Sequence, residues 1–251
     1  MKRLLFVLTA GLYMGFASAA RLNVETGTLN YGMYFGPLRA GDAKLVTTRV
    51  DYNGHETIRM DLIANTTKLA EKIYYLHDTL TTFIRISDSS PVHFRKHCFE
   101  GDDIVREKVD YTKLQNGSYS VSMRKDFKDG RIKENTVVSE EPVYDMVSIM
   151  AYARSINPSD LQSGERLNFK LASSARLKDE FLIFQDRETL KIAGRQYNCL
   201  VFKLVEPTIE KGILKENDIL IIYLSDDPSR TIVQMDIKFK IGSAKVKLIP
   251  G

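Results

Sequence analysis

The sequence contains no tryptophan, two cysteines and four histidines among its 251 residues. Two cysteines without a C-x-x-C motif are too few for a thiolate zinc site. Beyond the N-terminal segment, no uncharged run approaches the roughly 20 residues that a membrane helix needs. Neither sign of charge is in excess. Of 36 Lys and Arg and 32 Asp and Glu, only Lys2 and Arg3 precede residue 21, which leaves 34 basic residues against 32 acidic ones. A nucleic-acid partner is therefore not expected.

Sequence motifs of the common enzyme classes are also missing. There is no G-x-S-x-G nucleophile elbow, no H-E-x-x-H zinc motif, no P-loop and no dinucleotide-binding glycine pattern. His93 and His97 lie four residues apart on a predicted strand, and a spacing of about 13 Å does not allow them to share one ion. The sequence therefore predicts no catalytic residue, no metal site and no cofactor.

Two acidic clusters leave alternatives open. Residues 100–103 and Asp226-Asp227 could bind calcium or supply the paired carboxylates of glycoside hydrolysis. The same residue types also cap turns through their side chains, which is the interpretation we favour. A hydrolase that acts on envelope polymers through Asp145 and Asp226 is the alternative to a non-enzymatic protein.

The N-terminal segment is typical of a secretory signal peptide. A basic start at residues 2–3 precedes an uncharged run of 13 residues, 4–16, and Ala17-Ser18-Ala19 forms an A-x-A cleavage site. Because this run is shorter than a membrane span, we expect cleavage near Ala19 or Ala20 rather than a retained anchor. No cysteine stands directly after the cleavage site, so the mature chain is expected to be a soluble periplasmic or secreted protein and not a lipoprotein.

Turn dipeptides flanked by alternating apolar and polar residues predict a β meander. Asn53-Gly54 and Asn116-Gly117 each separate two alternating segments, and the positive φ that a tight primed turn demands gives Gly54 and Gly117 a structural role. Strands are predicted at 28–36, 44–52, 55–64, 79–87, 92–99, 104–114, 118–127, 131–138, 166–175, 180–192, 196–205, 218–225, 230–241 and 244–249. The short connections favour antiparallel pairing, because a parallel pair needs a longer crossover.

One helix is predicted over Val143–Arg154, after Pro142, and a helical turn at Lys68–Tyr75. The apolar stripe of the helix consists of Val143, Met146, Val147, Met150 and Ala151. Because a helix of about three turns is not stable alone, this stripe has to cover or plug the sheet. Asp145 and Arg154 are expected to be structural, with Arg154 directed at a carboxylate such as Asp226 or at strand-end carbonyl groups.

These elements predict an all-β, mainly antiparallel fold. Residues 1–20 are the signal peptide, and residues 21–251 are expected to form one curled or barrel-like domain with a single short helix packed on or in it. Cys98 alternates in step with the apolar residues of its strand, whereas Cys199 alternates out of step with Leu200 and Phe202. The difference disfavours a disulfide without excluding one.

Aromatic residues are numerous, with 12 Tyr and 12 Phe. Tyr31, Phe35, Tyr75 and Phe83 are candidates for lining an apolar ligand cavity inside a curled sheet. The alternative is that these residues simply fill the core.

The order of several short motifs resembles the domain of unknown function 3108 family of exported bacterial proteins. The motifs are Phe35-Gly36-Pro37-Leu38-Arg39-Ala40-Gly41-Asp42-Ala43, His77-Asp78, the turn at Pro91, Asp145-x-x-Ser148-x-x-x-Tyr152-x-Arg154, Gly194-Arg195-Gln196-Tyr197-Asn198-Cys199, and Tyr223-Leu224-Ser225-Asp226-Asp227 running into Lys240-Ile241-Gly242-Ser243. The resemblance spans nearly all of the mature chain. It implies a periplasmic, curled antiparallel sheet around a short helix, and it implies no particular activity.

Together these observations favour a non-enzymatic binding or scaffold protein of the bacterial cell envelope. The curved sheet is expected to hold an apolar or glycan ligand. A lipid, a glycan or an envelope protein is the expected partner, and no transmembrane segment is expected in the mature chain.

Overall fold

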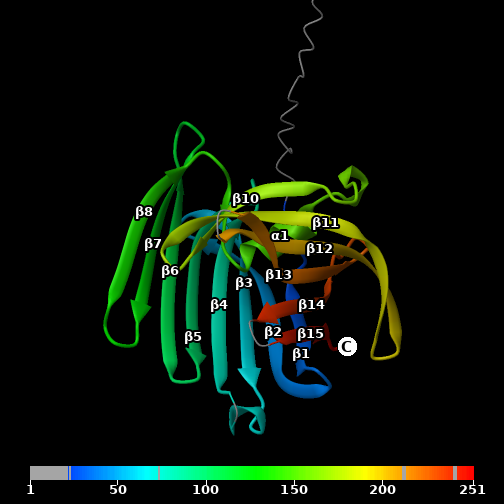
Figure 1. Ribbon diagram of the computed structural model, residues 1–251. Helices are drawn as coiled ribbons and strands as arrows, with labels where there is room; N and C mark the ends of the chain where they lie inside the picture. Colours follow the sequence, from blue (N-terminus) through cyan, green and yellow to red (C-terminus); the bar gives the residue numbers. More distant parts are fainter. Residues whose placement is uncertain (1–21, 23, 73, 211–212, 240–241) are drawn as a thin grey trace, which may run out of the picture.

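The computed structural model describes residues 22, 24–72, 74–210, 213–239 and 242–251 (Figure 1). The strands are β1 (Gly27–Phe35), β2 (Leu38–Tyr52), β3 (His55–Thr66), β4 (Leu76–Arg85), β5 (Pro91–Glu100), β6 (Asp103–Lys113), β7 (Tyr119–Phe127), β8 (Ile132–Ser139), β9 (Val143–Tyr144), β10 (Arg166–Ser173), β11 (Arg176–Ile192), β12 (Arg195–Glu210), β13 (Ile213–Ser225), β14 (Ile232–Phe239) and β15 (Gly242–Leu248). The helix α1 spans Ser148–Ser155, and 3-10 turns span Ala70–Lys72 and Pro158–Asp160. The helical turn predicted at Lys68–Tyr75 is therefore shorter than expected.

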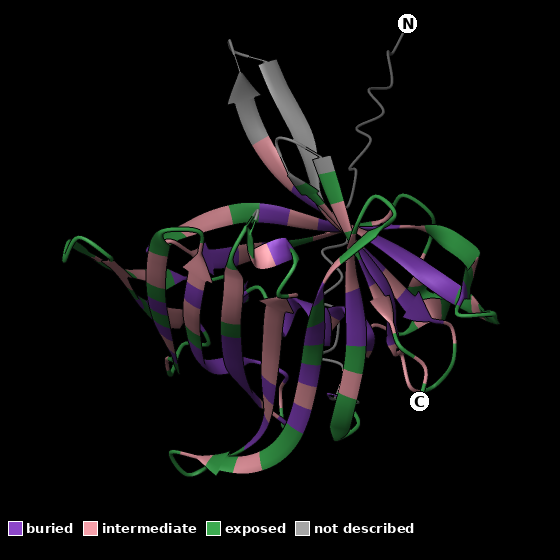
Figure 2. Cartoon of the chain, turned by 90° about the horizontal axis from the view of Figure 1, so that it is seen from below, coloured by how far each residue is buried: buried purple, intermediate pink, exposed green. Residues whose placement is uncertain are grey.

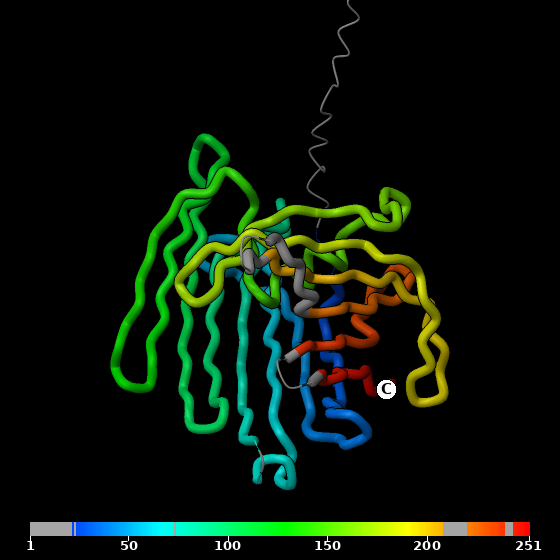
Figure 3. The backbone as a smooth tube through the Cα atoms, viewed as in Figure 1, coloured from blue at the N-terminus to red at the C-terminus, as the bar shows by residue number. Residues whose placement is uncertain are grey.

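All of these strands form one sheet of 15 strands that curls into a barrel-like shape. Strands that pair in the sheet also follow one another in the sequence, with one exception. β1 pairs with β15, so the first and last strands of the chain lie side by side. Figure 3 shows these blue and red segments side by side. Every pair is antiparallel apart from β9 with β10. The predicted all-β, mainly antiparallel, barrel-like fold is confirmed.

The sheet curls because several strand pairs contain bulges. Register shifts interrupt β1–β2, β4–β5, β11–β12, β12–β13 and β13–β14, and bulges bend the strand that carries them. At Gly41 the three strands β1–β3 approach closely. A Cβ at this position would collide with the side chain of Met33 and the backbone of Asn65, so only glycine fits.

The two asparagine–glycine turns differ from one another. Asn53 and Gly54 have φ values of 53° and 77°, which is the pattern of the predicted primed turn. Gly117 has φ 87°, but Asn116 is not among the positive-φ residues, and the Leu114 amide donates to the Ser118 carbonyl at 2.8 Å. The prediction of a tight primed turn at Asn116-Gly117 is therefore wrong. It is a longer loop that places its glycine in the left-handed conformation.

The helix begins later than predicted. Val143 and Tyr144 pair with β10 as the short strand β9, and the α-helix starts at Ser148. Met146, which the predicted stripe placed against the core, is 46% exposed. Residues before the first helical turn do not follow the helix periodicity. This explains why the predicted helix began too early and why Met146 was assigned to the buried stripe.

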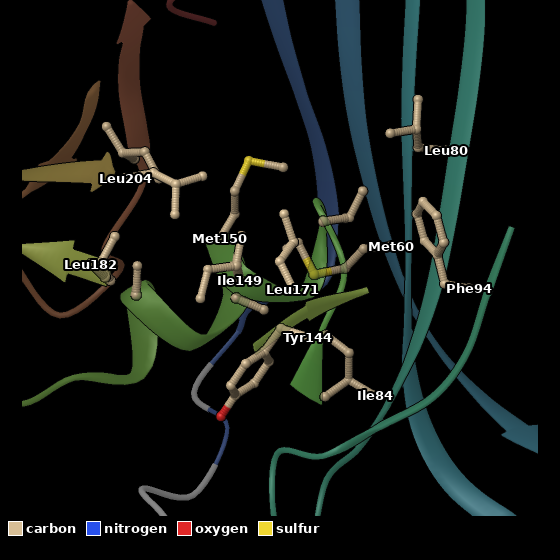
Figure 4. Close-up of a cluster of buried hydrophobic side chains, with 14 of the residues drawn as sticks. Met60, Leu80, Ile84, Phe94, Tyr144, Ile149, Met150, Leu171, Leu182 and Leu204 are labelled. Carbon is tan, nitrogen blue, oxygen red and sulfur yellow. The ribbon is translucent and has the colours of Figure 1, made fainter. Parts of the chain in front are cut away.

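The helix fills the inside of the curl, as the plug prediction required. Ile149 and Met150 are almost completely buried. Figure 4 shows them between Leu182 and Leu204 of β11 and β12 on one side and Met60 and Phe94 of β3 and β5 on the other. One helix therefore supplies the side chains that occupy the space between both halves of the sheet.

The sheet closes without pairing its two edge strands, β8 and β9. Instead, the turn between β10 and β11 reaches the inner face of β6 and β7. The Ser174 amide donates to Glu107 at 2.9 Å, and Lys125 contacts both the Ser174 hydroxyl, at 3.0 Å, and Glu107, at 3.4 Å. This polar contact closes the barrel between β7 and the β10–β11 turn.

Cys98 and Cys199 are both free and buried. Cys98 belongs to the main core, whereas Cys199 packs with Ile192 and Val233 in a small separate cluster. The two thiols lie in different clusters, as their opposite strand parity indicated. Among the described residues, no helix combines the length and hydropathy that crossing a bilayer requires.

Candidate functional site

The four aromatic candidates do not line one cavity. Tyr31 is buried in the core, and its hydroxyl has no hydrogen-bond partner among the described residues. Phe83 is buried against Tyr52, at a ring distance of 4.1 Å, and His93. Phe35 and Tyr75 are exposed near turns at the ends of β1 and β4. The structure therefore gathers none of the other three around Tyr31.

Asp145 is a fully buried cap of the helix. Its carboxylate accepts hydrogen bonds from the backbone amides of Val147 and Ser148, both at 2.9 Å, and from the Thr82 hydroxyl at 2.9 Å. Burial raises the pKa of Asp145, and these hydrogen bonds work in the opposite direction. Because every contact is structural and the group is closed to solvent, Asp145 is not placed for catalysis.

Arg154 is buried at the other end of the helix. Its guanidinium donates to the carbonyl oxygens of Arg230, at 3.0 Å, and Ser229, at 3.2 Å. Of the two alternatives from the sequence, the strand-end carbonyls are therefore its partners. Asp226 instead forms ion pairs with Arg187, at 3.0 Å, and Arg230, at 3.1 Å.

Charged side chains lie on the inner face of β4 and β5. Asp78 is opposite Cys98, and Lys96 is opposite the core residue Leu80, so all of them share the inward face. Ligand atoms of Asp78, Cys98 and Glu100 lie within 4.8 Å of one another. Lys96 approaches Glu100 to 4.0 Å and supplies a compensating positive charge. The group is thus a mixed polar cluster inside the curl.

Burial controls the protonation of this inner cluster. It raises the pKa of Asp78 to about 6, with a further increase from Glu100 and opposing contributions from Cys98 and Lys96. Burial also raises the pKa of the Cys98 thiol, which therefore stays protonated at neutral pH. A protonated thiol beside a lysine is a poor metal ligand. The three donor groups could therefore hold an ion only if the thiol lost its proton and the lysine charge moved away.

Glu180 is a second inward carboxyl group, on β11. It lies opposite the core residue Phe169 and is only 1% exposed. Neither of its oxygens has a hydrogen-bond partner among the residues that the structure describes. Burial, and then the nearby Glu206, raise the pKa of Glu180 to about 8, although Lys178 lowers it. Lys178 pairs with Glu206 at 2.5 Å, and within the described part of the chain no cation forms a salt bridge with Glu180.

Apolar side chains of the inner face are not all covered by the helix. Met33, Leu62, Ala64, Leu220 and Ile237 pack against the core but remain partly exposed. They come from β1, β3, β13 and β14, which lie in one continuous section of the sheet with the order β3-β2-β1-β15-β14-β13. In Figure 2 buried, intermediate and exposed stretches alternate along the strands, and the hairpin ends are largely exposed. Solvent therefore reaches an apolar part of the concave face, next to charged inward residues.

A curled, barrel-like antiparallel sheet with a plugged interior defines the class of this protein. The chain belongs to the family described as "Protein of unknown function (DUF3108)", which matches residues 30–249. Its fold is also similar to the crystal structure of a β-barrel-like protein of domain of unknown function DUF1849 from Brucella abortus. That similarity has a TM-score of 0.57 at 12% identity and covers 91% of this chain and 97% of the other. No curated protein matches the sequence.

The inward charged residues were not predicted from the sequence, although their position in the alternation of each strand indicates them. Lys96 and Glu100 alternate in step with Phe94 and Cys98, and Glu180 alternates in step with Leu182. Charged residues in the apolar register of a strand indicate polar groups inside a sheet.

Proposed function

We propose that this protein is a non-enzymatic binding module of the bacterial cell envelope that holds an amphiphilic ligand on the concave face of its sheet. The observation that carries the proposal is the combination of partly exposed apolar side chains, such as Leu62 and Ile237, with inward charges such as Asp78 and Lys96. An amphiphile satisfies both surfaces, because its chain covers apolar area and its polar group meets the charges.

Export is part of this proposal. The basic start, the short apolar run and the A-x-A site of residues 1–20 support cleavage near Ala19 or Ala20 and release of a soluble, unacylated chain. Intact-mass analysis of the protein purified from the envelope fraction tests it. A retained leader or an added acyl mass would contradict it.

Binding is tested with an apolar fluorescent probe, N-phenyl-1-naphthylamine. The purified protein should enhance probe fluorescence saturably, and Leu62→Lys should abolish the enhancement by placing a charge on the concave face. Leu38→Lys is the matched control, because Leu38 is 48% exposed at the β1–β2 turn. Absence of saturable binding, or equal loss in both variants, would reject the proposal.

A hydrolase is the alternative function, but its candidate acidic residues are Asp78 and Glu100 and no longer Asp145 and Asp226. Asp145 and Asp226 are occupied by hydrogen bonds and ion pairs, whereas Asp78 and Glu100 are adjacent and inward. A carboxyl group with pKa about 6 is suited to general acid catalysis near neutral pH. Release of soluble fragments from purified cell-wall glycan by the native protein, but not by Asp78→Asn, would favour this alternative.

A further inference from the structure

The two edges of the sheet are protected very differently. β9 is two residues long, and both residues are buried. β8 has eight residues and, in the part of the chain that the structure describes, pairs only with β7. It contains no proline, and no bulge interrupts its register. Natural proteins usually block such an edge, because its free backbone groups can pair with another strand.

Both faces of β8 are also open. Ile132 and Val138, on the outer face, are 54% and 65% exposed. Asn135, on the inner face opposite Met123, is exposed as well. The contact that closes the barrel is made by Glu107 and Lys125 on β6 and β7, so β8 lies beyond it. Figure 1 shows β8 at the outer border of the sheet.

We infer that β8 is a pairing surface for a second copy of this chain, joined antiparallel about a two-fold axis at Asn135. Residues opposite each other must share a face, which restricts the possible registers. With Asn135 opposite its own counterpart, Ile132 lies opposite Val138 in both halves of the interface. Glu134 lies opposite Thr136, and Lys133 lies opposite Val137. The two exposed apolar residues cover each other, and no two like charges are directly opposed.

Charge along the strand fits the same arrangement. Arg131 and Lys133 lie at the beginning of β8, and Glu140 and Glu141 follow its end. Antiparallel pairing places the basic beginning of each copy beside the acidic end of the other. A parallel arrangement would instead place like charges together. The interface is isologous and therefore closes at two copies, which also removes the exposed edge.

Analytical ultracentrifugation over a range of protein concentrations tests the inference. The native protein should form a dimer, and Ile132→Lys combined with Val138→Lys should lose it while the circular dichroism spectrum stays native. Leu38→Lys combined with Leu69→Lys is the matched control, because both leucines are exposed far from β8, and it should still dimerise.

Cysteine cross-linking tests the register. Asn135→Cys should form a disulfide-linked dimer under mild oxidation, because directly opposed Cα atoms lie about 4.5–5.5 Å apart. Lys133→Cys should not, because its counterpart lies four residues, about 13 Å, along the strand. The native cysteines are buried and do not compete.

A monomer at every concentration overturns the inference. So does a dimer that persists in the double lysine variant, or cross-linking through Lys133→Cys but not Asn135→Cys. None of these results depends on ligand binding, so the failure of this inference and of the proposed function can be told apart.

Discussion

Two buried carboxyl groups inside the curl have opposite surroundings. Asp145 is fully buried and accepts hydrogen bonds from Thr82, Val147 and Ser148. Glu180 is equally inaccessible, at 1% exposure, and neither of its oxygens has a hydrogen-bond partner in the described ranges of the chain. The first lies in the helix-filled interior, where it accepts hydrogen bonds from backbone amides at the start of α1. The second lies on β11 opposite the core residue Phe169, where a buried carboxyl group is retained at a cost in stability.

The largest effect should come from breaking the helix-filled region. Met150→Asp should prevent folding, because it removes a large core side chain and buries an unpaired carboxylate, together several kcal/mol of a typical total of about 5–15. Met146→Asp is the matched control, because Met146 is 46% exposed and Met150 only 2%. Circular dichroism and denaturant titration measure both. Similar stabilities for the two variants would show that α1 does not plug the sheet.

Removing the satisfied carboxyl group should have the next largest effect. Asp145→Ala leaves two buried amides without acceptors and the Thr82 hydroxyl without its partner, at a cost of about 2–4 kcal/mol. Thr82→Val, which removes only one of these donors, should cost less. Chemical denaturation provides the comparison, and an Asp145→Ala protein of native stability would contradict the assignment of Asp145 as a cap.

Removing the unsatisfied carboxyl group should have the opposite sign. The pKa of Glu180 is about 8 in the folded protein against an ordinary value of 4.5. Folding therefore favours its protonated form, and the native protein loses stability as pH rises from about 4.5 to 8. Glutamine has no titratable proton, so Glu180→Gln should be more stable than the native protein by up to about 4 kcal/mol at pH 8.

The pH dependence of this gain is the decisive measurement. Melting temperatures of the native protein and of Glu180→Gln should converge near pH 4.5 and differ most at pH 8 and above. A difference that stays constant with pH would show that the carboxyl group ionises normally in the folded state.

The smallest effect should come from Asp78, which is only partly buried. Its pKa is raised from 3.8 to about 6, so the stabilising effect of Asp78→Asn should develop between these pH values and stay constant above pH 6. Solvent screening at this partly exposed site limits the gain to about 0.5 kcal/mol. Thermal melts at pH 4 and pH 7 check this, and a gain that continued to grow up to pH 8 would contradict it.

Some of these features could be predicted from the sequence, and others could not. The alternation of apolar and polar residues located nearly all strands, and the parity of Cys98 and Cys199 separated the two thiols correctly. The same alternation also indicated the inward charges, because Glu180 has the same strand parity as the core residue Leu182. By contrast, the hydrogen bond from Thr82 to Asp145 joins residues 63 positions apart, and no local pattern indicates it.

The positions of most strands and hairpins follow from local sequence, because turn residues such as Asn53-Gly54 and the period of two depend only on neighbouring residues. The start of the helix depends on long-range pairing, because Val143 and Tyr144 pair with β10 and so form a strand. It also decided which aromatic residues face inward and how the sheet closes. These features depend on the curl of the whole sheet, and the curl brings together groups, such as Glu107 and Ser174, that are far apart in the chain.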